Sequence, residues 1–227
     1  MKKLLIGLAI AGACGGAIAN EQDAEQVNYG DPTASFSSLG VSASEDSTQL
    51  NGMIGLGSNI FQLDLGVDNK SGDMNYRGRY FHVTDGLGYS VDVLGDKDNT
   101  TALAGAIYKF QVTDNIMLFP MASVGYTTSD AVEGEGERKA KSESALGQLG
   151  LYGMYGFDAG HWIYANPKAT YHEQSKEWIP QIEVGGGYMI LDNASIGAKV
   201  EYTGESSKKN LVKKEDTVAW LQASYYF

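Results

Sequence analysis

The chain is organised by short runs in which apolar and polar residues alternate with a period of two. In the clearest run, residues 61–68, one face is apolar and the other polar or glycine: Phe61, Leu63, Leu65 and Val67 against Gln62, Asp64, Gly66 and Asp68. Successive side chains of a β-strand point to opposite faces, so this run predicts a strand with one apolar and one polar face.

Runs of the same kind follow one another through most of the chain. Residues 20–31 are polar and are expected to form a short lead, and residues 33–42 form a weak, serine-rich first strand. The further strands are predicted at 50–56, 61–68, 75–80, 89–93, 100–110, 118–126, 145–157, 163–172, 181–190, 195–202 and 218–227. This pattern indicates an all-β protein of about 12 strands, with 10 as the alternative because the first two strands have the weakest pattern.

The predicted connections alternate between two kinds. Tight turns rich in Gly, Asp and Asn fall at 57–59, 85–87, 113–115, 158–160 and 192–193. The connections between them are mostly longer and more charged, at 44–47, 69–73, 95–99, 129–142, 173–177 and 204–216. Tight turns on one side and longer loops on the other are typical of transmembrane barrels with both termini on the turn side.

The last ten residues, 218–227, carry the most informative pattern. One face is entirely apolar or aromatic: Ala219, Leu221, Ala223, Tyr225 and Phe227. A strand of about ten residues with such a face has the length to cross a bilayer when tilted. The terminal Phe227, with Tyr225 two residues before it, resembles the end of bacterial outer-membrane β-barrels. That resemblance implies an outer-membrane location, contact with membrane lipid and lipopolysaccharide, and an assembly signal read by the barrel-assembly machinery.

The amino terminus predicts export. Lys2 and Lys3 precede an apolar stretch, and residues 17–19 (Ala-Ile-Ala) form a small-x-small cleavage site. We therefore expect a signal peptide at 1–19 and a barrel domain at 20–227. Cys14 raises the alternative of a lipoprotein, but Ala11 stands where a large aliphatic residue is usual.

Composition fits the barrel and narrows the function. The chain has 29 glycines, 14 tyrosines and only 4 prolines, and no segment after residue 19 approaches the roughly 20 apolar residues of a membrane helix. A soluble β-sandwich or lipocalin-like barrel would also alternate. The export signal, the terminal Phe and the outward face favour a transmembrane antiparallel up-and-down β-barrel instead. The net charge of −11 argues against nucleic acid as a partner.

The candidate chemistry lies on the polar face, because charged side chains are costly toward lipid and natural in a lumen. The predicted pore-lining residues are Asp64, Asp68, Arg77, Arg79, Asp92, Lys168, His172, Glu183, Lys199 and Glu201. Arg77 and Arg79 lie between strands that carry Asp64 and Asp92, so cross-strand ion pairs are expected.

Two interpretations of this polar face stay open. The charges could form a salt-bridged filling of a non-conducting barrel that acts through its extracellular loops. They could also line a small porin-like channel, whose opposed acidic and basic walls orient ions or small polar solutes. A barrel of about 12 strands falls between the filled 8-stranded and the open 16-stranded kinds.

An enzyme is not expected. The histidines are His82, His161 and His172, and only His172 has neighbours, Glu173 and Ser175, that could suggest catalysis. No G-x-S-x-G setting surrounds Ser175, so a surface loop explains these residues more simply. The histidines are too few and dispersed for a metal site, and no helix follows the glycine-rich runs to make a phosphate loop, so no cofactor is expected.

Overall fold

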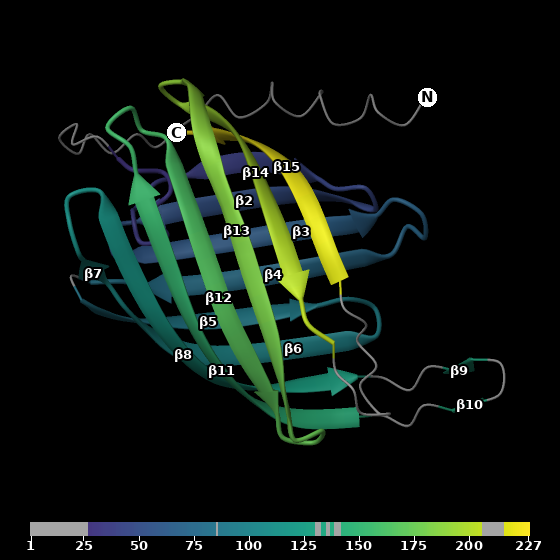
Figure 1. Ribbon diagram of the computed structural model, residues 1–227. Coiled ribbons are helices and arrows are strands. Elements are labelled where there is room, and N and C mark those ends of the chain that lie inside the picture. The colour runs from purple at the N-terminus through teal and green to yellow at the C-terminus, as the bar shows by residue number, and fades with distance from the viewer. Residues whose placement is uncertain (1–26, 85, 130–132, 135–136, 139–141, 206–215) are drawn as a thin grey trace.

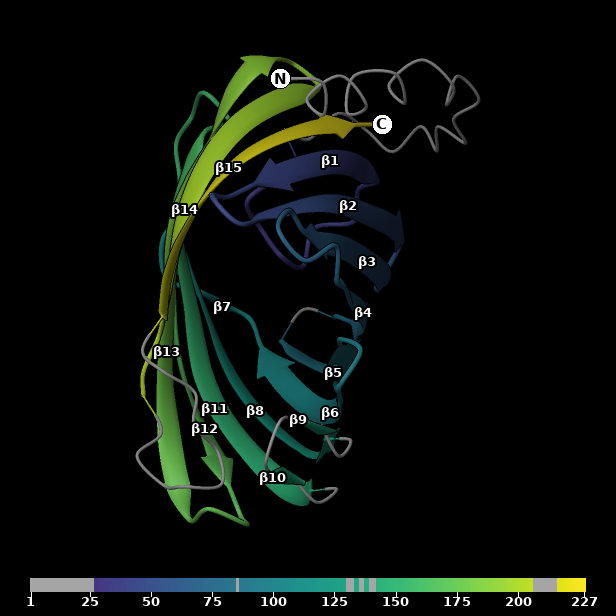
Figure 2. The same cartoon turned by 90° about the vertical axis from the view of Figure 1, so that its right-hand side faces the viewer.

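The computed structural model describes residues 27–84, 86–129, 133–134, 137–138, 142–205 and 216–227. It is a closed, all-β barrel of 12 antiparallel strands (Figures 1 and 2). Within these residues no helix is long and apolar enough to cross a membrane. The predicted signal peptide at 1–19, with Cys14, lies outside the described residues.

The strands follow one another around the barrel in chain order. The wall consists of β1 (Ser38–Ala43), β2 (Ser47–Leu56), β3 (Asn59–Asp68), β4 (Met74–His82), β5 (Leu87–Gly95), β6 (Asn99–Tyr108), β8 (Ile116–Ser129), β11 (Ser142–Gly156), β12 (Trp162–His172), β13 (Glu177–Leu191), β14 (Ala194–Thr203) and β15 (Asp216–Tyr226). The short β7 (Phe110–Gln111) continues β6 along β8, and β9 (Glu133–Gly134) pairs with β10 (Glu137–Arg138) in the connection between β8 and β11.

The barrel is closed by pairing of its first and last strands. β1 lies antiparallel to β15, with Leu39 opposite Tyr225 and Ala43 opposite Leu221. On the far side β8 pairs with β11 along its length, from Ser129 opposite Ser142 to Ile116 opposite Tyr155. Every strand of the wall therefore has two neighbours. The prediction of 12 strands is confirmed, and the 10-stranded alternative is wrong because the two weak first strands both form.

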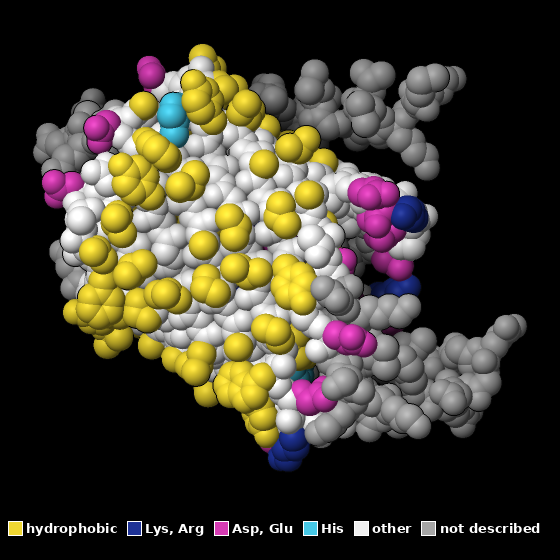
Figure 3. All heavy atoms as spheres, viewed as in Figure 1, with side chains coloured by type: hydrophobic (Ala, Val, Ile, Leu, Met, Phe, Trp, Pro, Cys, Tyr) yellow, Lys and Arg dark blue, Asp and Glu magenta, His cyan; other side chains and the backbone are white. Residues whose placement is uncertain are grey.

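The outer surface of the barrel is apolar, as the alternation predicts. On β3 the residues Phe61, Leu63 and Val67 face outward and are exposed, and on β15 so are Leu221, Tyr225 and Phe227. Figure 3 shows one side of the barrel, on which hydrophobic side chains spread over the outer surface and acidic and basic side chains gather toward the ends. Such a band would be a serious liability in water and is what a lipid environment requires.

The two ends of the barrel differ, again as predicted. The connections at 57–58, 83–86, 112–115, 157–161 and 192–193 form one end, which we call the turn end. Gly57 (φ 59°) and Gly160 (φ 81°) supply backbone conformations there that residues with a Cβ rarely adopt. Both described termini, before β1 and after β15, lie at this end. The other end, the loop end, carries the connections near 44–46, 69–73, 96–98, 173–176 and the long ones, whose residues 130–132, 135–136, 139–141 and 206–215 lie outside the described residues.

The segment before β1 differs from the prediction. Residues 33–37 are not part of the first strand, because residues 28–34 form turns in which Asp31 accepts hydrogen bonds from the Thr33 N–H and hydroxyl. The described part of the expected polar lead, from Val27 onward, does not trail away from the barrel. Residues 27–37, which we call the N-terminal segment, lie inside the turn end of the lumen.

Contacts of the N-terminal segment reach several parts of the wall. The Lys109 ammonium lies 2.7 Å from the Asp31 carboxylate, and the Tyr152 hydroxyl donates a 3.0 Å hydrogen bond to the Gly30 carbonyl. Tyr29 stacks on the inward-facing ring of Tyr226 with centroids 3.8 Å apart. A Cβ on Gly30 would overlap the Trp162 side chain, so the segment fits closely against the inner wall.

An apolar cluster fills the lumen beside this segment. Its buried members are Ile107, Met117, Phe119 and Met154, and Trp162 and Tyr164 pack against them. Phe119 has no exposed surface at all. The turn-end half of the lumen is therefore packed like a small protein core, whereas polar residues occupy the other half.

Replacing Phe119 with Ala should lower the free energy of unfolding by about 3–5 kcal/mol, because the ring is fully buried and its loss leaves a cavity. Val124→Ala on the same strand is the control, since Val124 is 70% exposed on the outer face and should cost much less. Urea unfolding of the refolded barrel in lipid vesicles measures both. Equal losses for the two variants would contradict the presence of a packed lumen core.

Candidate functional site

The polar half of the lumen contains a cavity of about 690 Å³ that is lined by side chains from both sides of the barrel. Eight of the ten predicted pore-lining residues line it: Asp64, Arg77, Arg79, Asp92, Lys168, Glu183, Lys199 and Glu201. Pro32 of the N-terminal segment and Ile107 of the apolar cluster also line the cavity, which thus reaches the packed turn-end half.

The first charge cluster lies on β4 and β5. Arg79 is directly opposite Asp92 in the ladder, and Arg77 is two residues further along β4 on the same face. The Arg77 Nε and Nη2 atoms lie 3.0 and 2.9 Å from the two Asp92 oxygens, and the Arg79 Nε donates to the same carboxylate at 2.9 Å. The predicted cross-strand pairing with Asp92 is confirmed. Two cations share one anion, so the cluster carries a net positive charge.

Among the described residues, Asp64 makes no hydrogen bond to either arginine. Its carboxylate instead accepts hydrogen bonds from the Asn51 and Gln62 amides, at 2.9 and 3.2 Å. Asn51 in turn accepts from the Ser42 hydroxyl at 2.6 Å, and Gln222 donates to Ser42 at 3.2 Å. This polar chain crosses the seam between β15 and β1 and ties the closing strands together from inside.

The second charge cluster lies on β13 and β14. The Lys199 ammonium is 3.4 Å from a Glu183 oxygen and also contacts Glu201, and it lies 5.6 Å from the centroid of the Trp220 ring. The register places Glu183 directly opposite Glu201, which brings both carboxylates to one cation. Two anions share one cation, so this cluster carries a net negative charge.

These two clusters face each other across the lumen. In the strand order, five strands separate β4 from β13 in either direction, and the same holds for β5 and β14. Lys168 on β12 lies between the clusters: it interacts electrostatically with Arg77 and Asp92 across the lumen and with Glu183 and Glu201 beside it. The Lys168 side chain makes no ion pair or hydrogen bond among the described residues, and Lys168 lines the cavity.

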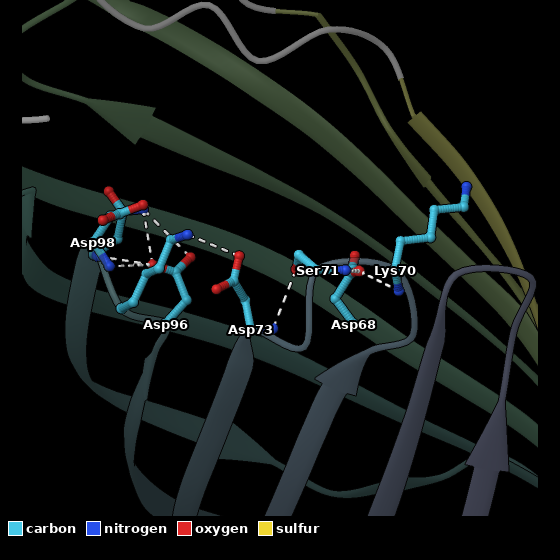
Figure 4. A network of polar contacts seen from close by, with 8 residues as sticks. Asp68, Lys70, Ser71, Asp73, Asp96 and Asp98 are labelled. Carbon is cyan, nitrogen blue, oxygen red and sulfur yellow. Dashed lines mark hydrogen bonds and ion pairs between the residues drawn. The ribbon is translucent and has the colours of Figure 1, made fainter. Parts of the chain in front are cut away.

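The remaining two predicted residues do not line the cavity. His172 lies at the loop-end terminus of β12. Asp68 ends β3 and organises the next loop, where its carboxylate accepts hydrogen bonds from the backbone N–H groups of Lys70 and Ser71 at 2.8 and 2.7 Å (Figure 4). The alternation placed both on the inward parity correctly, but each stands where its strand has already reached the rim.

At the loop-end rim, aspartate side chains accept hydrogen bonds from groups close to them. Asp96 caps its loop by accepting hydrogen bonds from the N–H groups of Asp98 and Asn99 (Figure 4). The Lys97 ammonium donates to Asp73 on the neighbouring connection at 2.8 Å. This hydrogen bond holds the pKa of the Asp73 carboxyl below its ordinary value, and a hydrogen bond from Ser71 adds a weaker effect in the same direction. The rim loops are thus ordered even though they are exposed.

The three histidines lie in different parts of the barrel. His82 bonds Asn59 at the turn end, and His161 stacks on Tyr188. Ser175 lies in the rim connection after His172. No group of three or more His, Cys, Asp or Glu side chains that could hold a metal ion occurs in the part of the chain that the structure describes.

Several lumen residues were missed by the sequence. Tyr152, Tyr164 and Trp220 line the cavity, although tyrosine and tryptophan are expected mainly in the outer aromatic girdles. Their inward parity was readable from the strand alternation. The Lys109–Asp31 contact had no such signal, because it joins a strand end to a turn 78 residues away.

Comparison with solved structures supports this description. The chain is similar to the NanC porin (TM-score 0.59, 10% identity, covering 83% of this chain and 98% of that one). It is also similar to the COG4313 outer membrane channel from Pseudomonas putida F1 (TM-score 0.60, 12% identity, 88% and 100% covered). The KdgM porin is a third match (TM-score 0.55, 8% identity, 84% and 98% covered). No family model and no curated protein matches the sequence.

The chain has the fold of an outer-membrane porin. These likenesses cover nearly the whole length of each neighbour, so the predicted porin-like outer-membrane barrel is confirmed at the level of fold. The exposed apolar band and this fold together support the predicted location in the outer membrane. The three neighbours named above are described as porins or channels.

Replacing Asp92 with Asn should destabilise the barrel, because Arg77 and Arg79 would lose the carboxylate that they share. The Asp92 side chain is only 14% exposed. Removing one partner of a largely buried pair costs several kcal/mol, and access to water in the lumen reduces the loss to about 2–3 kcal/mol. Asp98→Asn on the rim is the control. Equal urea midpoints for Asp92→Asn and the unmodified protein would show that the cluster contributes nothing to stability.

Proposed function

We propose that this protein is a small porin-like channel for the passive passage of ions or small polar solutes across the outer membrane. The observation that carries the proposal is the polar cavity of about 690 Å³, lined by charged side chains, within a closed 12-stranded barrel. Charged walls replace part of the hydration of a passing polar solute, and they would be costly in a lumen kept dry.

A specific observation favours the alternative of a non-conducting barrel that acts through its loops. The N-terminal segment and the Phe119 cluster occupy the turn-end half of the lumen, so a solute that enters from the loop end meets them before it can leave. The contacts of Tyr29 and Asp31 are side-chain contacts, and the N-terminal segment pairs with no strand ladder of the wall. The segment would therefore narrow the channel and keep its conductance small without sealing it permanently.

Single-channel recording in planar bilayers tests the choice. The refolded protein should show a modest conductance, and Tyr29→Ala should increase it, because the change removes the stacking on Tyr226 that holds the segment in the lumen. Tyr188→Ala is the matched control, since Tyr188 is exposed on the outer surface and should leave the current unchanged. Absence of current above background in both the unmodified protein and Tyr29→Ala would favour the non-conducting alternative.

We also propose that the outer surface contacts membrane lipid and lipopolysaccharide, and that Tyr225 and Phe227 act as the signal for the barrel-assembly machinery. Both rings face outward beside each other, and the Phe227 N–H donates a 3.0 Å hydrogen bond to the Ser37 carbonyl just before β1. These residues thus stand at the seam where the last strand must meet the first, a position at which recognition and closure could be coupled.

Deleting Phe227 should lower the amount of assembled protein in cells while leaving the refolded barrel intact. The outward Phe227 side chain is about half exposed, so losing it together with the N–H hydrogen bond to Ser37 should cost only about 2 kcal/mol of folding free energy. Heat-modifiable gel mobility measures assembly in the outer membrane, and circular dichroism measures the β content in detergent. Leu221→Ala, which also removes an outward apolar side chain from β15, is the control. Normal assembly without Phe227 would contradict a signalling role.

A further inference from the structure

The two charge clusters do not present their charges equally to the cavity. On the β4–β5 wall the side chains of Arg77 and Arg79 are 34% and 20% exposed, whereas the Asp92 that they share is 14% exposed. On the β13–β14 wall Glu183 and Glu201 are 25% and 36% exposed, whereas Lys199 is 15% exposed. In each cluster the shared charge is the more buried one.

This inequality gives the two clusters opposite signs toward the lumen. Asp64, opposite Arg77 in the ladder, is buried and accepts hydrogen bonds from Asn51 and Gln62, so it adds little negative charge to the surface of the cavity. Lys168 adds a cation beside the second cluster. A small solute between the two clusters meets guanidinium groups on one side and carboxylates on the other. Because β4 and β5 stand opposite β13 and β14, the resulting field runs across the channel and not along it. Charges on the walls of a protein cavity act on a solute more strongly than they would in bulk water.

Lys168 refines this arrangement. Its ammonium makes no ion pair among the described residues, and its electrostatic neighbours include Arg77 across the lumen. Arg77 uses its Nε and Nη2 atoms on Asp92, which leaves the Nη1 donors for another group. A carboxylate in the cavity could therefore bind between Lys168 and Arg77, since guanidinium and carboxylate geometry match well. An ammonium group on the same solute would lie toward Glu201, the most exposed of these acidic side chains.

We propose that the solute class preferred by this lumen is a small zwitterion that carries an ammonium and a carboxylate a few bonds apart, such as an α-amino acid. This inference rests on the proposed channel function and specifies its substrate class. A solute with only a carboxylate gains from Lys168 and Arg77 but is repelled by Glu183 and Glu201, a solute with only an ammonium meets the reverse, and a neutral polyol gains from neither set of charges. A zwitterion satisfies both walls at once, with its carboxylate toward Lys168 and Arg77 and its ammonium toward Glu183 and Glu201.

Liposome swelling compares the entry of alanine with that of lactamide, an uncharged molecule of nearly the same size and shape. The unmodified protein should admit alanine at least twofold faster than lactamide. The double variant Glu183→Gln, Glu201→Gln should reduce this ratio to about that of free diffusion, because the glutamine amides still fill the wall but no longer attract the ammonium. The double variant Glu45→Gln, Glu173→Gln removes the same charge from the loop-end rim and should keep the ratio of the unmodified protein.

The outcomes separate this inference from the channel itself. Swelling with both solutes at equal rates, or a ratio that the lumen double variant leaves unchanged, overturns the zwitterion preference while the channel stands. Absence of swelling with either solute contradicts the channel, and binding then decides the inference through saturation-transfer NMR of alanine on the detergent-folded protein. Transfer to alanine that is lost in Glu183→Gln, Glu201→Gln supports the site, and absence of transfer in the unmodified protein overturns it.

Discussion

The pairing of β1 with β15 is the interaction on which the rest of the structure depends. A lipid environment offers no partner to a free backbone N–H or carbonyl, so a sheet that crosses it must have no open edge. Here a six-residue first strand, Ser38–Ala43, completes the ladder. It is the shortest strand of the wall. The hydrogen bonds among Gln222, Ser42, Asn51 and Asp64 support it from the lumen side.

Closure in turn determines what each face can hold. In a closed barrel, successive side chains of each strand point alternately toward the lipid and toward the lumen. This is why the sequence predicted the outward face of β3 and β15 and the lumen position of charges such as Arg77 and Glu183. Each turn, such as those near Gly57 and Gly160, must reverse the chain at a membrane surface. The turns therefore divide the sequence into strands that can be counted.

What the sequence could not reveal follows from the same rule. Alternation reports only the parity of a side chain within a strand, so it says nothing about a segment that is not a strand. The N-terminal segment is held in the lumen by contacts of Tyr29 and Asp31 with residues that are far away in the sequence. Alternation also does not tell where along the barrel axis a residue lies. Asp68 therefore has the same inward parity as Asp64 yet stands at the rim, while Asp64 lines the cavity.

The positions of the charged side chains in the lumen also decide which opposite charges balance them. Each cluster contains an odd number of charges, two arginines with Asp92 and two glutamates with Lys199, so neither cluster is neutral by itself. Asp64 beside the first cluster and Lys168 beside the second supply the balancing charges. The excess charges of the two clusters are opposite in sign and stand on opposite walls. The two clusters thus attract each other across the cavity, which water and salt can enter. Mobile ions screen such an interaction far more than they screen a contact within one cluster. The lumen therefore combines rigid local pairs, which hold the side chains in place, with a field across the cavity that a passing solute can share.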